Sequence, residues 1–232
     1  MSTVAADEIA KFGRLAPRWW DTAGPMRPLH RMNPLRVGWI DRHITARLSE
    51  PVRLLDLGCG AGIAAEALAR RGHTVLGVDA SAEAIAAAEA HAEGEGLPLT
   101  YRTGSAEDLE AEGQRFDVVT SLEVIEHVDD QQGFMRLLAN LTQPGGLVFI
   151  STLNRTLRSL AVAKIGAEYI ARLLPAGTHD WRRFVAPEAL AGYGREAGLR
   201  LIDITGMEMS PLTGNWRASR DVGVNYLAAF QK

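Results

Sequence analysis

The chain lacks several features that would define its class at once. It has one cysteine, Cys59, so it cannot form an internal disulfide, and we expect a reducing, cytoplasmic location. No uninterrupted apolar run of about 18 residues occurs, which argues against a membrane-spanning helix, and the N-terminal segment does not resemble a secretory signal. A large excess of one charge is missing too. The net charge of −3 gives no general reason to expect nucleic acid as a partner.

Short apolar runs alternate with helical segments through most of the 232 residues. This rhythm predicts one doubly wound α/β fold, with a mostly parallel sheet and helices on both faces. Strands are expected at 52–57, 74–79, 98–102, 116–121, 147–152, 199–204 and 224–231. Helices are expected at 63–72, 82–94, 130–140 and 187–198.

Two parts of the chain do not follow this rhythm. Residues 1–48 include the stretch 19–36, which has three prolines among basic residues, and predict an N-terminal helical cap on the domain formed by 49–232. Residues 153–184 form an insertion. Within it, 155–183 carry six Lys or Arg and two acids, a net charge of +4, whereas the other 19 basic and 26 acidic residues give −7. A predicted helix at 155–175 has a wide apolar face beside basic residues, which suits peripheral contact with an anionic membrane surface. A helix packed on the domain as a lid or a dimer contact is the alternative.

The stretch LLDLGCGAG indicates a nucleotide-binding turn. Asp56 ends a predicted strand, and Gly58, Gly60 and Gly62 follow at the turn into a helix. Asp79 ends the second strand, where a carboxylate can accept hydrogen bonds from ribose hydroxyls. The spacing is G-x-G-x-G, and an acid lies two residues before the first glycine. That acid suits a ligand with an ammonium group and a sulfonium, S-adenosylmethionine, better than a pyrophosphate, which disfavours a nicotinamide dehydrogenase. A purely structural tight turn is the other possibility.

Two further stretches agree with this cofactor. The segment GSAEDL presents Ala106 and Glu107 after the third strand, where the adenine would lie, and PGG at 144–146 makes a sharp turn before the next strand. Together with the glycine loop, these motifs resemble the class I S-adenosylmethionine-dependent methyltransferases over about residues 50–152 and the closing strands. The resemblance implies a seven-stranded sheet with a reversed last hairpin.

Segments outside this core carry a closer resemblance. RWWDTAGPMRPLHRMNPLR (18–36), STLNRTLRS (151–159), GAEYIARLLPAGTHDWRRF (166–184) and VNY (224–226) resemble the ubiquinone-biosynthesis O-methyltransferases. That family implies O-methylation of polyprenyl-substituted phenols, a 2-polyprenyl-6-hydroxyphenol and a 3-demethylubiquinol, at the inner membrane face. A ubiquinone-biosynthesis complex is a further partner that the resemblance implies. By position, the resemblance places cofactor contacts at Arg36, Gly58, Asp79 and Leu122. Many relatives have methionine at the last position, and leucine preserves its volume.

The stretch SLEVIEHV supplies candidates for the acceptor chemistry. If 123–127 begin a helical turn, then Glu123, Glu126 and His127 share one face. They could act as a general base or hold Mg²⁺ or another divalent cation, which the family makes plausible. The alternative is the polar start of a surface helix, where acids favour the dipole. His179 beside Asp180 is a second candidate base, or one half of a loop hydrogen bond.

Other functions remain open at this point. The same core could methylate another small phenolic or acidic acceptor, although 17–36 and 153–184 argue against it. A cofactor-binding scaffold without turnover is the third reading, and the candidates at 123, 126 and 127 weigh against that one.

Overall fold

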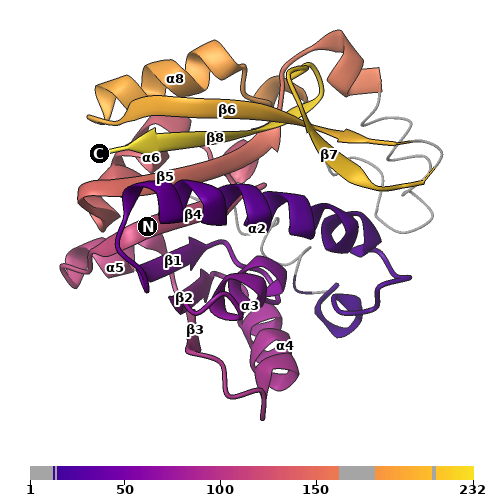
Figure 1. The fold of residues 1–232 in the computed structure, drawn as a ribbon, viewed down its shortest axis with the longest axis vertical. Helices are drawn as coiled ribbons and strands as arrows, with labels where there is room; N and C mark the ends of the chain where they lie inside the picture. The colour runs from indigo at the N-terminus through magenta and orange to yellow at the C-terminus, as the bar shows by residue number, and fades with distance from the viewer. Residues whose placement is uncertain (1–12, 14, 162–180, 211–212) are drawn as a thin grey trace.

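The computed structural model describes residues 13, 15–161, 181–210 and 213–232. Its centre is an eight-stranded sheet in the order β3-β2-β1-β4-β5-β8-β6-β7 (Figure 1). The strands are β1 Arg53–Leu57, β2 Thr74–Asp79, β3 Leu99–Thr103, β4 Phe116–Leu122, β5 Thr142–Leu153, β6 Arg200–Met209, β7 Trp216–Ser219 and β8 Asn225–Gln231.

The predicted parallel sheet and its reversed closing hairpin are confirmed. Strands β1 to β5 pair in parallel, while β8 runs antiparallel to both β5 and β6. The structure has one strand more than the seven expected, because β7 adds an antiparallel edge strand to β6. This four-residue strand has no buried side chain and no apolar run, so hydrophobic periodicity could not reveal it.

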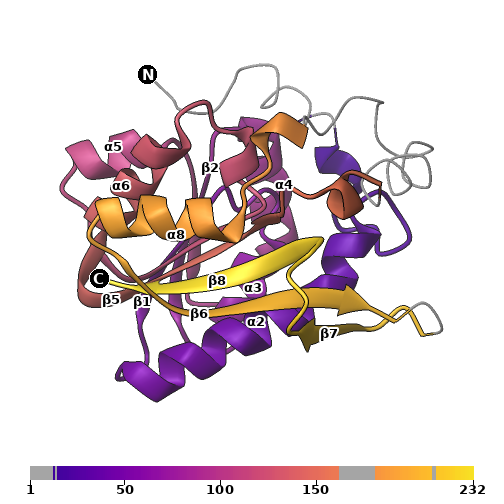
Figure 2. The same cartoon turned by 90° about the horizontal axis from the view of Figure 1, so that it is seen from above.

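Helices cover both faces of the sheet (Figure 2). One face carries α2 Arg27–Arg47, α3 Ile63–Ala69 and α4 Ala82–Ala92. The other carries α5 Ala106–Ala111, α6 Gln131–Leu141 and α8 Pro187–Glu196. Short 3-10 turns lie at Ala16–Arg18, Ile125–His127 and Trp181–Arg183. The sheet is thereby buried on both faces, as its apolar central strands require.

Helix α2 packs directly on the sheet beside α3. Its Trp39, Ile40 and Ile44 join the cluster formed by Leu54 of β1 and Phe149 of β5, and all five side chains are buried. The boundary at residue 48 between cap and domain stays a prediction. The packing means that α2 can present side chains to the cofactor side of the sheet from a fixed position.

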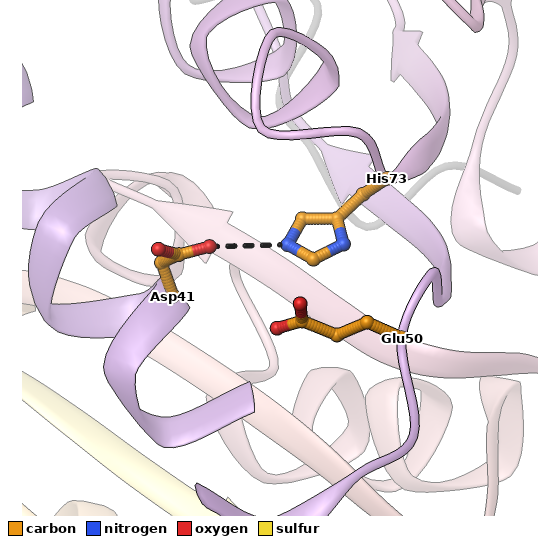
Figure 3. A group of neighbouring side chains, drawn as sticks. All are labelled: Asp41, Glu50 and His73. Carbon is orange, nitrogen blue, oxygen red and sulfur yellow. Dashed lines mark hydrogen bonds and ion pairs between the residues drawn. The ribbon is translucent and has the colours of Figure 1, made fainter. Parts of the chain in front are cut away.

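A polar cluster joins the end of α2 to the amino ends of β1 and β2. The ligand-type atoms of Asp41, Glu50 and His73 all lie within 4.8 Å of one another (Figure 3). Asp41 accepts from His73 Nε2 at 3.3 Å and pairs with Arg71, and Glu50 accepts from the Thr45 hydroxyl at 2.6 Å. Because protein partners already bind both acids, we interpret this cluster as a structural link between the helix and the sheet.

Most of the insertion lies outside the described residues. A helix begins at residue 157 and is described through 161, so the rest of the predicted helix at 155–175 and the candidates His179 and Asp180 cannot be placed. Within the described part of the chain, no helix combines the length and apolar character needed to cross a membrane.

Candidate cofactor and acceptor site

The glycine loop connects β1 to α3 at the carboxyl edge of the sheet. The amides of Gly58 and Cys59 donate to Val78 O at 2.7 and 3.1 Å, and the amide of Gly60 donates to Asp79 Oδ2 at 2.8 Å. These bonds fix the loop against the end of β2. The loop therefore lies at the carboxyl edge of the sheet, and its predicted role in cofactor binding stays a prediction.

Glycine is required in this loop for two reasons. Gly58, Gly60 and Gly62 have φ values of 74°, 54° and 88°, a region that side chains with Cβ rarely adopt. In addition, a Cβ at Gly60 would collide with Trp19, and one at Gly62 would collide with the Tyr101 hydroxyl. The loop is thus packed closely from both sides.

Asp56 is a buried carboxylate, and one of its two oxygens accepts a hydrogen bond within the protein. It is 2% exposed, and its Oδ1 accepts a 2.7 Å hydrogen bond from the Thr120 hydroxyl. Among the described residues, none provides a hydrogen-bond partner for its Oδ2. Burial raises the pKa of Asp56 to about 6, against the Thr120 hydrogen bond and the nearby Arg36 charge, which both lower it. A buried acceptor left in this way is ready for a ligand donor.

Arg36 is the cationic counterpart of Asp56. Its side chain is 3% exposed, and its Nη2 donates to Asn33 Oδ1 at 3.3 Å. No described residue accepts a hydrogen bond from its Nε. Burial lowers the pKa of Arg36, and the charges of Glu123 and Asp56 oppose that shift. The site therefore holds a buried cation and a buried anion, each with a polar atom still to be matched.

Asp79 lies at the end of β2 next to the loop. Its Oδ1 accepts from the amide of Ser81 and its Oδ2 from that of Gly60, both at 2.8 Å. Burial raises the pKa of Asp79, and these amide hydrogen bonds lower it. The other predicted cofactor positions follow neighbouring strands. Ala106 and Glu107 begin α5 after β3, and Leu122 is the last residue of β4.

The acceptor candidates lie just beyond β4. Glu123 has φ of 59°, and its Oε1 accepts a 2.7 Å hydrogen bond from the Ser151 hydroxyl. Glu126 is 3% exposed and accepts from the Thr152 hydroxyl at 2.9 Å. Burial and the neighbouring Glu123 charge raise the pKa of Glu126 to about 8. Both carboxylates are thus held by hydroxyls of β5.

The expectation of one helical turn over 123–127 is wrong. The 3-10 turn spans only Ile125–His127, and Glu123 lies before it in the left-handed region. Glu123 and Glu126 therefore do not share a helical face. The described residues hold one group of three whose ligand atoms all lie within 4.8 Å, and that group is at the opposite end of the sheet, not at these residues.

Sequence reasoning did not single out the residues that orient these groups. Thr120 orients Asp56, Asn33 contacts Arg36, and Trp19 covers Gly60. Of these residues, only Asn33 could have been found from the sequence, because it lies three residues before Arg36 on a helix and therefore beside it.

The strand order, the glycine loop and the acids that end β1 and β2 define a class I S-adenosylmethionine-dependent methyltransferase. A family model described as a methyltransferase domain matches residues 30–204. The chain belongs to the ubiquinone biosynthesis O-methyltransferases. It is 46% identical to the protein of that name from Methylobacterium nodulans, covering 99% of this chain and 96% of the relative. It is 47% identical to that from Stutzerimonas stutzeri, covering 98% and 97%.

Solved structures support the fold. Magnesium protoporphyrin IX methyltransferase from Synechocystis with bound SAH superposes with a TM-score of 0.64 at 21% identity, covering 85% of this chain and 82% of that one. A possible histamine N-methyltransferase from Thermotoga maritima gives a TM-score of 0.67 at 17% identity, covering 96% and 99%.

Proposed function

We propose that this protein transfers a methyl group from S-adenosylmethionine to ring hydroxyls of polyprenyl-substituted phenols. The acceptors are a 2-polyprenyl-6-hydroxyphenol and a 3-demethylubiquinol. The observation that carries the cofactor is the pair of unmatched buried atoms, Arg36 Nε and Asp56 Oδ2, beside the glycine loop. One ligand end with a carboxylate and an ammonium group matches both. Relatives in ubiquinone biosynthesis support the acceptor class.

The remaining contacts follow from the cofactor's shape. Gly58, Gly60 and Gly62 supply the positive-φ turn that brings the loop backbone to the cofactor, and Asp79 accepts from the ribose hydroxyls after exchanging part of its present amide bonding. Ala106 and Glu107 lie at the adenine, and Leu122 supplies an apolar wall.

In the transfer, a bond between the phenol oxygen and the methyl carbon would form as the methyl–sulfur bond breaks, and S-adenosylhomocysteine would leave with that electron pair. The phenol oxygen attacks and must lose a proton, although a free phenol titrates near pH 10, about as tyrosine does. Holding the two reactants in line contributes roughly 7–11 kcal/mol to lowering the barrier. Glu123, Glu126 and His127 are the groups on the acceptor side that we propose to receive or stabilise this proton. His179 stays a candidate outside the described residues.

We also propose a divalent cation, Mg²⁺ or a similar ion, at Glu123, Glu126 and His127. Two carboxylates and one imidazole are an acceptable donor set. Burial and the neighbouring Glu123 charge raise the pKa of Glu126, and a bound cation would favour the ionised form of this carboxyl. The donor atoms are not gathered around one point, so binding requires side-chain rotation. When bound, the cation would lower the pKa of the phenol.

The insertion at 153–184 supports peripheral attachment to the inner face of an anionic membrane. At its described start, the Leu157 side chain is 77% exposed, and the surrounding segment is basic. The polyprenyl tail of the acceptor resides in the bilayer, so contact there would present the ring without extracting the tail. We propose a cytoplasmic location with this contact, within a ubiquinone-biosynthesis complex.

One assay tests the acceptor and the cation together. Transfer of labelled methyl to a short-tailed demethylubiquinol is measured with and without a chelator, using Asp56→Asn as the cofactor-site control. We expect transfer to the quinol, loss on chelation and recovery with Mg²⁺. Transfer only to an unrelated phenol or acid would favour the alternative acceptor. Full activity of Glu123→Ala under exhaustive chelation would exclude the cation.

A further inference from the structure

We propose that Asn33 is a positioning residue for cofactor binding, because it holds Arg36 in register with the glycine loop. Its carboxamide donates from Nδ2 to Ile63 O at 2.8 Å and accepts on Oδ1 from Arg36 Nη2 at 3.3 Å. Arg36 contacts the cofactor only under the function proposed above, so the role of Asn33 rests on that function.

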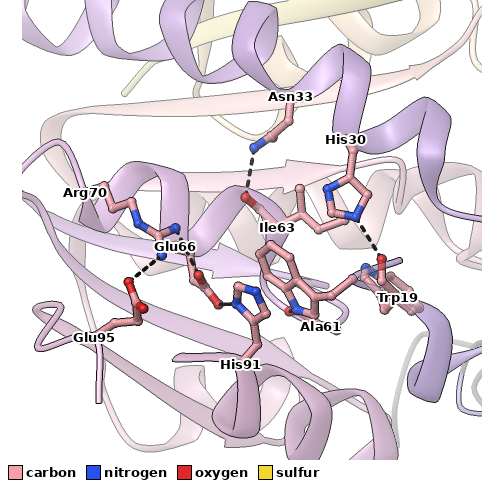
Figure 4. A network of polar contacts seen from close by, with 10 residues as sticks. Trp19, His30, Asn33, Ala61, Ile63, Glu66, Arg70, His91 and Glu95 are labelled. Atoms are coloured by element: carbon pink, nitrogen blue, oxygen red, sulfur yellow. Dashed lines mark hydrogen bonds and ion pairs between the residues drawn. The ribbon is translucent and has the colours of Figure 1, made fainter. Parts of the chain in front are cut away.

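The bridge joins two elements that must keep a fixed separation. Ile63 is the first residue of α3 and directly follows Gly62, so its carbonyl moves with the loop. Asn33 and Arg36 both belong to α2, one turn apart. Figure 4 shows the Asn33 amide directed at the Ile63 carbonyl. Any slide of α2 along the sheet would therefore move Arg36 and stretch this bond together.

Asparagine at position 33 fits a role in positioning Arg36 better than a role in stabilising helix α2. Asparagine is a poor residue for a helix interior, and burying its amide costs free energy unless both ends are bonded. Asn33 is 7% exposed, and Pro34 after it already removes one backbone donor from the helix. A carboxamide offers a donor and an acceptor at once, which this bridge needs.

A second set of contacts attaches the segment before α2 to the glycine loop and to α4 through other residues. Trp20 Nε1 donates to Ala61 O at 2.9 Å, and its ring stacks on His91 with 3.4 Å between centroids. His91 Nδ1 lies 2.8 Å from an oxygen of the buried Glu66, and His30 Nε2 lies 2.9 Å from Trp19 O (Figure 4). These contacts hold the N-terminal segment on the loop, and they provide a matched control.

Two ligands separate positioning from general stability. S-adenosylhomocysteine carries the amino-acid carboxylate, whereas 5′-methylthioadenosine lacks it. We expect Asn33→Ala to weaken binding of S-adenosylhomocysteine about tenfold, the scale of one hydrogen bond to a charged group, and to change binding of methylthioadenosine less than about twofold. Calorimetry on the full chain gives both dissociation constants.

Three further variants complete the experiment. Asn33→Asp keeps the volume but cannot donate to Ile63 O, so it should show the same selective loss if Asn33→Ala folds poorly. Adding Asn33→Ala to Arg36→Ala should not weaken binding of S-adenosylhomocysteine any further, because Asn33 acts through Arg36. Trp20→Phe loses the bond to Ala61 but leaves the bridge, and should affect the two ligands equally.

Each outcome has a distinct meaning. Equal weakening of both ligands by the Asn33 variants, additive losses with Arg36→Ala, or no loss at all would overturn the positioning role. If Arg36→Ala itself fails to discriminate between the ligands, the proposed carboxylate contact is wrong, and the role of Asn33 falls with it. Selective loss in Arg36→Ala without selective loss in the Asn33 variants would overturn only the inference drawn for Asn33.

Discussion

The Thr120 hydroxyl on β4 donates a 2.7 Å hydrogen bond to Oδ1 of Asp56 on β1. Both side chains are buried, and the strands pair in parallel with Asp56 opposite Thr120. The bond fixes the rotation of the carboxylate and leaves its second oxygen for another donor. Burial nevertheless raises the pKa of Asp56 to about 6. The cofactor site therefore contains an acid whose charge is costly until a cationic ligand arrives.

Cofactor affinity should fall as the pH drops below about 6. Asp56 must be ionised to pair with an ammonium group, and its raised pKa of about 6 places the loss of that charge near this pH. Well below it, the dissociation constant for S-adenosylhomocysteine should rise by up to about tenfold per pH unit. Calorimetry between pH 5 and 7.5 measures this. Asp56→Asn should bind weakly with a flatter profile, and a constant affinity of the unaltered chain would contradict the assignment.

Asp56→Asn should stabilise the ligand-free protein while it abolishes activity. The folded pKa of about 6 lies above the ordinary value of 3.8, so the folded state binds this proton more tightly than the unfolded state does. The ionised group consequently costs stability as the pH rises from about 3.8 to 6, and the full cost is present above that range. At pH 7.5 we expect the free energy of unfolding to increase by about 1–3 kcal/mol.

Urea denaturation at pH 7.5 and 5 checks this expectation. The gain should be smaller at pH 5, where Asp56 is already largely protonated in the folded state. The amide of the variant keeps an oxygen for Thr120, but its NH2 group takes the place of Oδ2, for which no described residue provides a partner. The cost of this unmatched donor reduces the gain from removing the buried charge. A destabilised variant at pH 7.5 would show that the carboxylate is matched by other groups.

Local sequence could identify the glycine loop and its acids because backbone rules require glycine at these positions. Residues that orient the site were not apparent, since Thr120 reaches Asp56 across 64 positions of the chain. The prediction of a helical turn over 123–127 was wrong for a related reason. Glu123 adopts φ of 59° while its amide donates to Ser151 O at 3.0 Å, and this contact with β5 outweighs local propensity. The fold followed from periodicity, whereas site geometry depended on pairing between distant strands.

Gly62→Ala should cost more stability than Gly72→Ala. Both glycines have positive φ, 88° and 94°, so both substitutions carry the same backbone cost of roughly 1–2 kcal/mol. At Gly62 the new Cβ would also collide with the Tyr101 hydroxyl, whereas nothing lies within 4 Å at Gly72. We expect an additional loss of about 1–3 kcal/mol at Gly62 in urea denaturation. Equal losses would mean that Tyr101 moves aside freely.

Two buried threonines on neighbouring strands should separate cofactor binding from methyl transfer. Thr120 on β4 donates to Asp56, and Thr152 on β5 donates to Glu126 at 2.9 Å. The Thr120 hydroxyl orients Asp56, and its hydrogen bond lowers the pKa of that carboxyl. Without it, in Thr120→Val, the dissociation constant for S-adenosylhomocysteine should rise about tenfold. The loss of affinity at acid pH should also begin at a higher pH. Thr152→Val leaves Asp56 intact but releases Glu126 on the acceptor side.

For Thr152→Val we expect kcat to fall about tenfold while the affinity for S-adenosylhomocysteine changes less than about twofold. The two variants make the same change of hydroxyl to methyl at side chains that are 0% exposed, so each controls for the effect of the other on folding. Steady-state methyl transfer to a short-tailed demethylubiquinol gives kcat, and calorimetry gives the affinity. Loss of cofactor affinity in Thr152→Val without loss of kcat would remove Glu126 from the acceptor side, because the hydroxyl of Thr152 would then act on the cofactor instead.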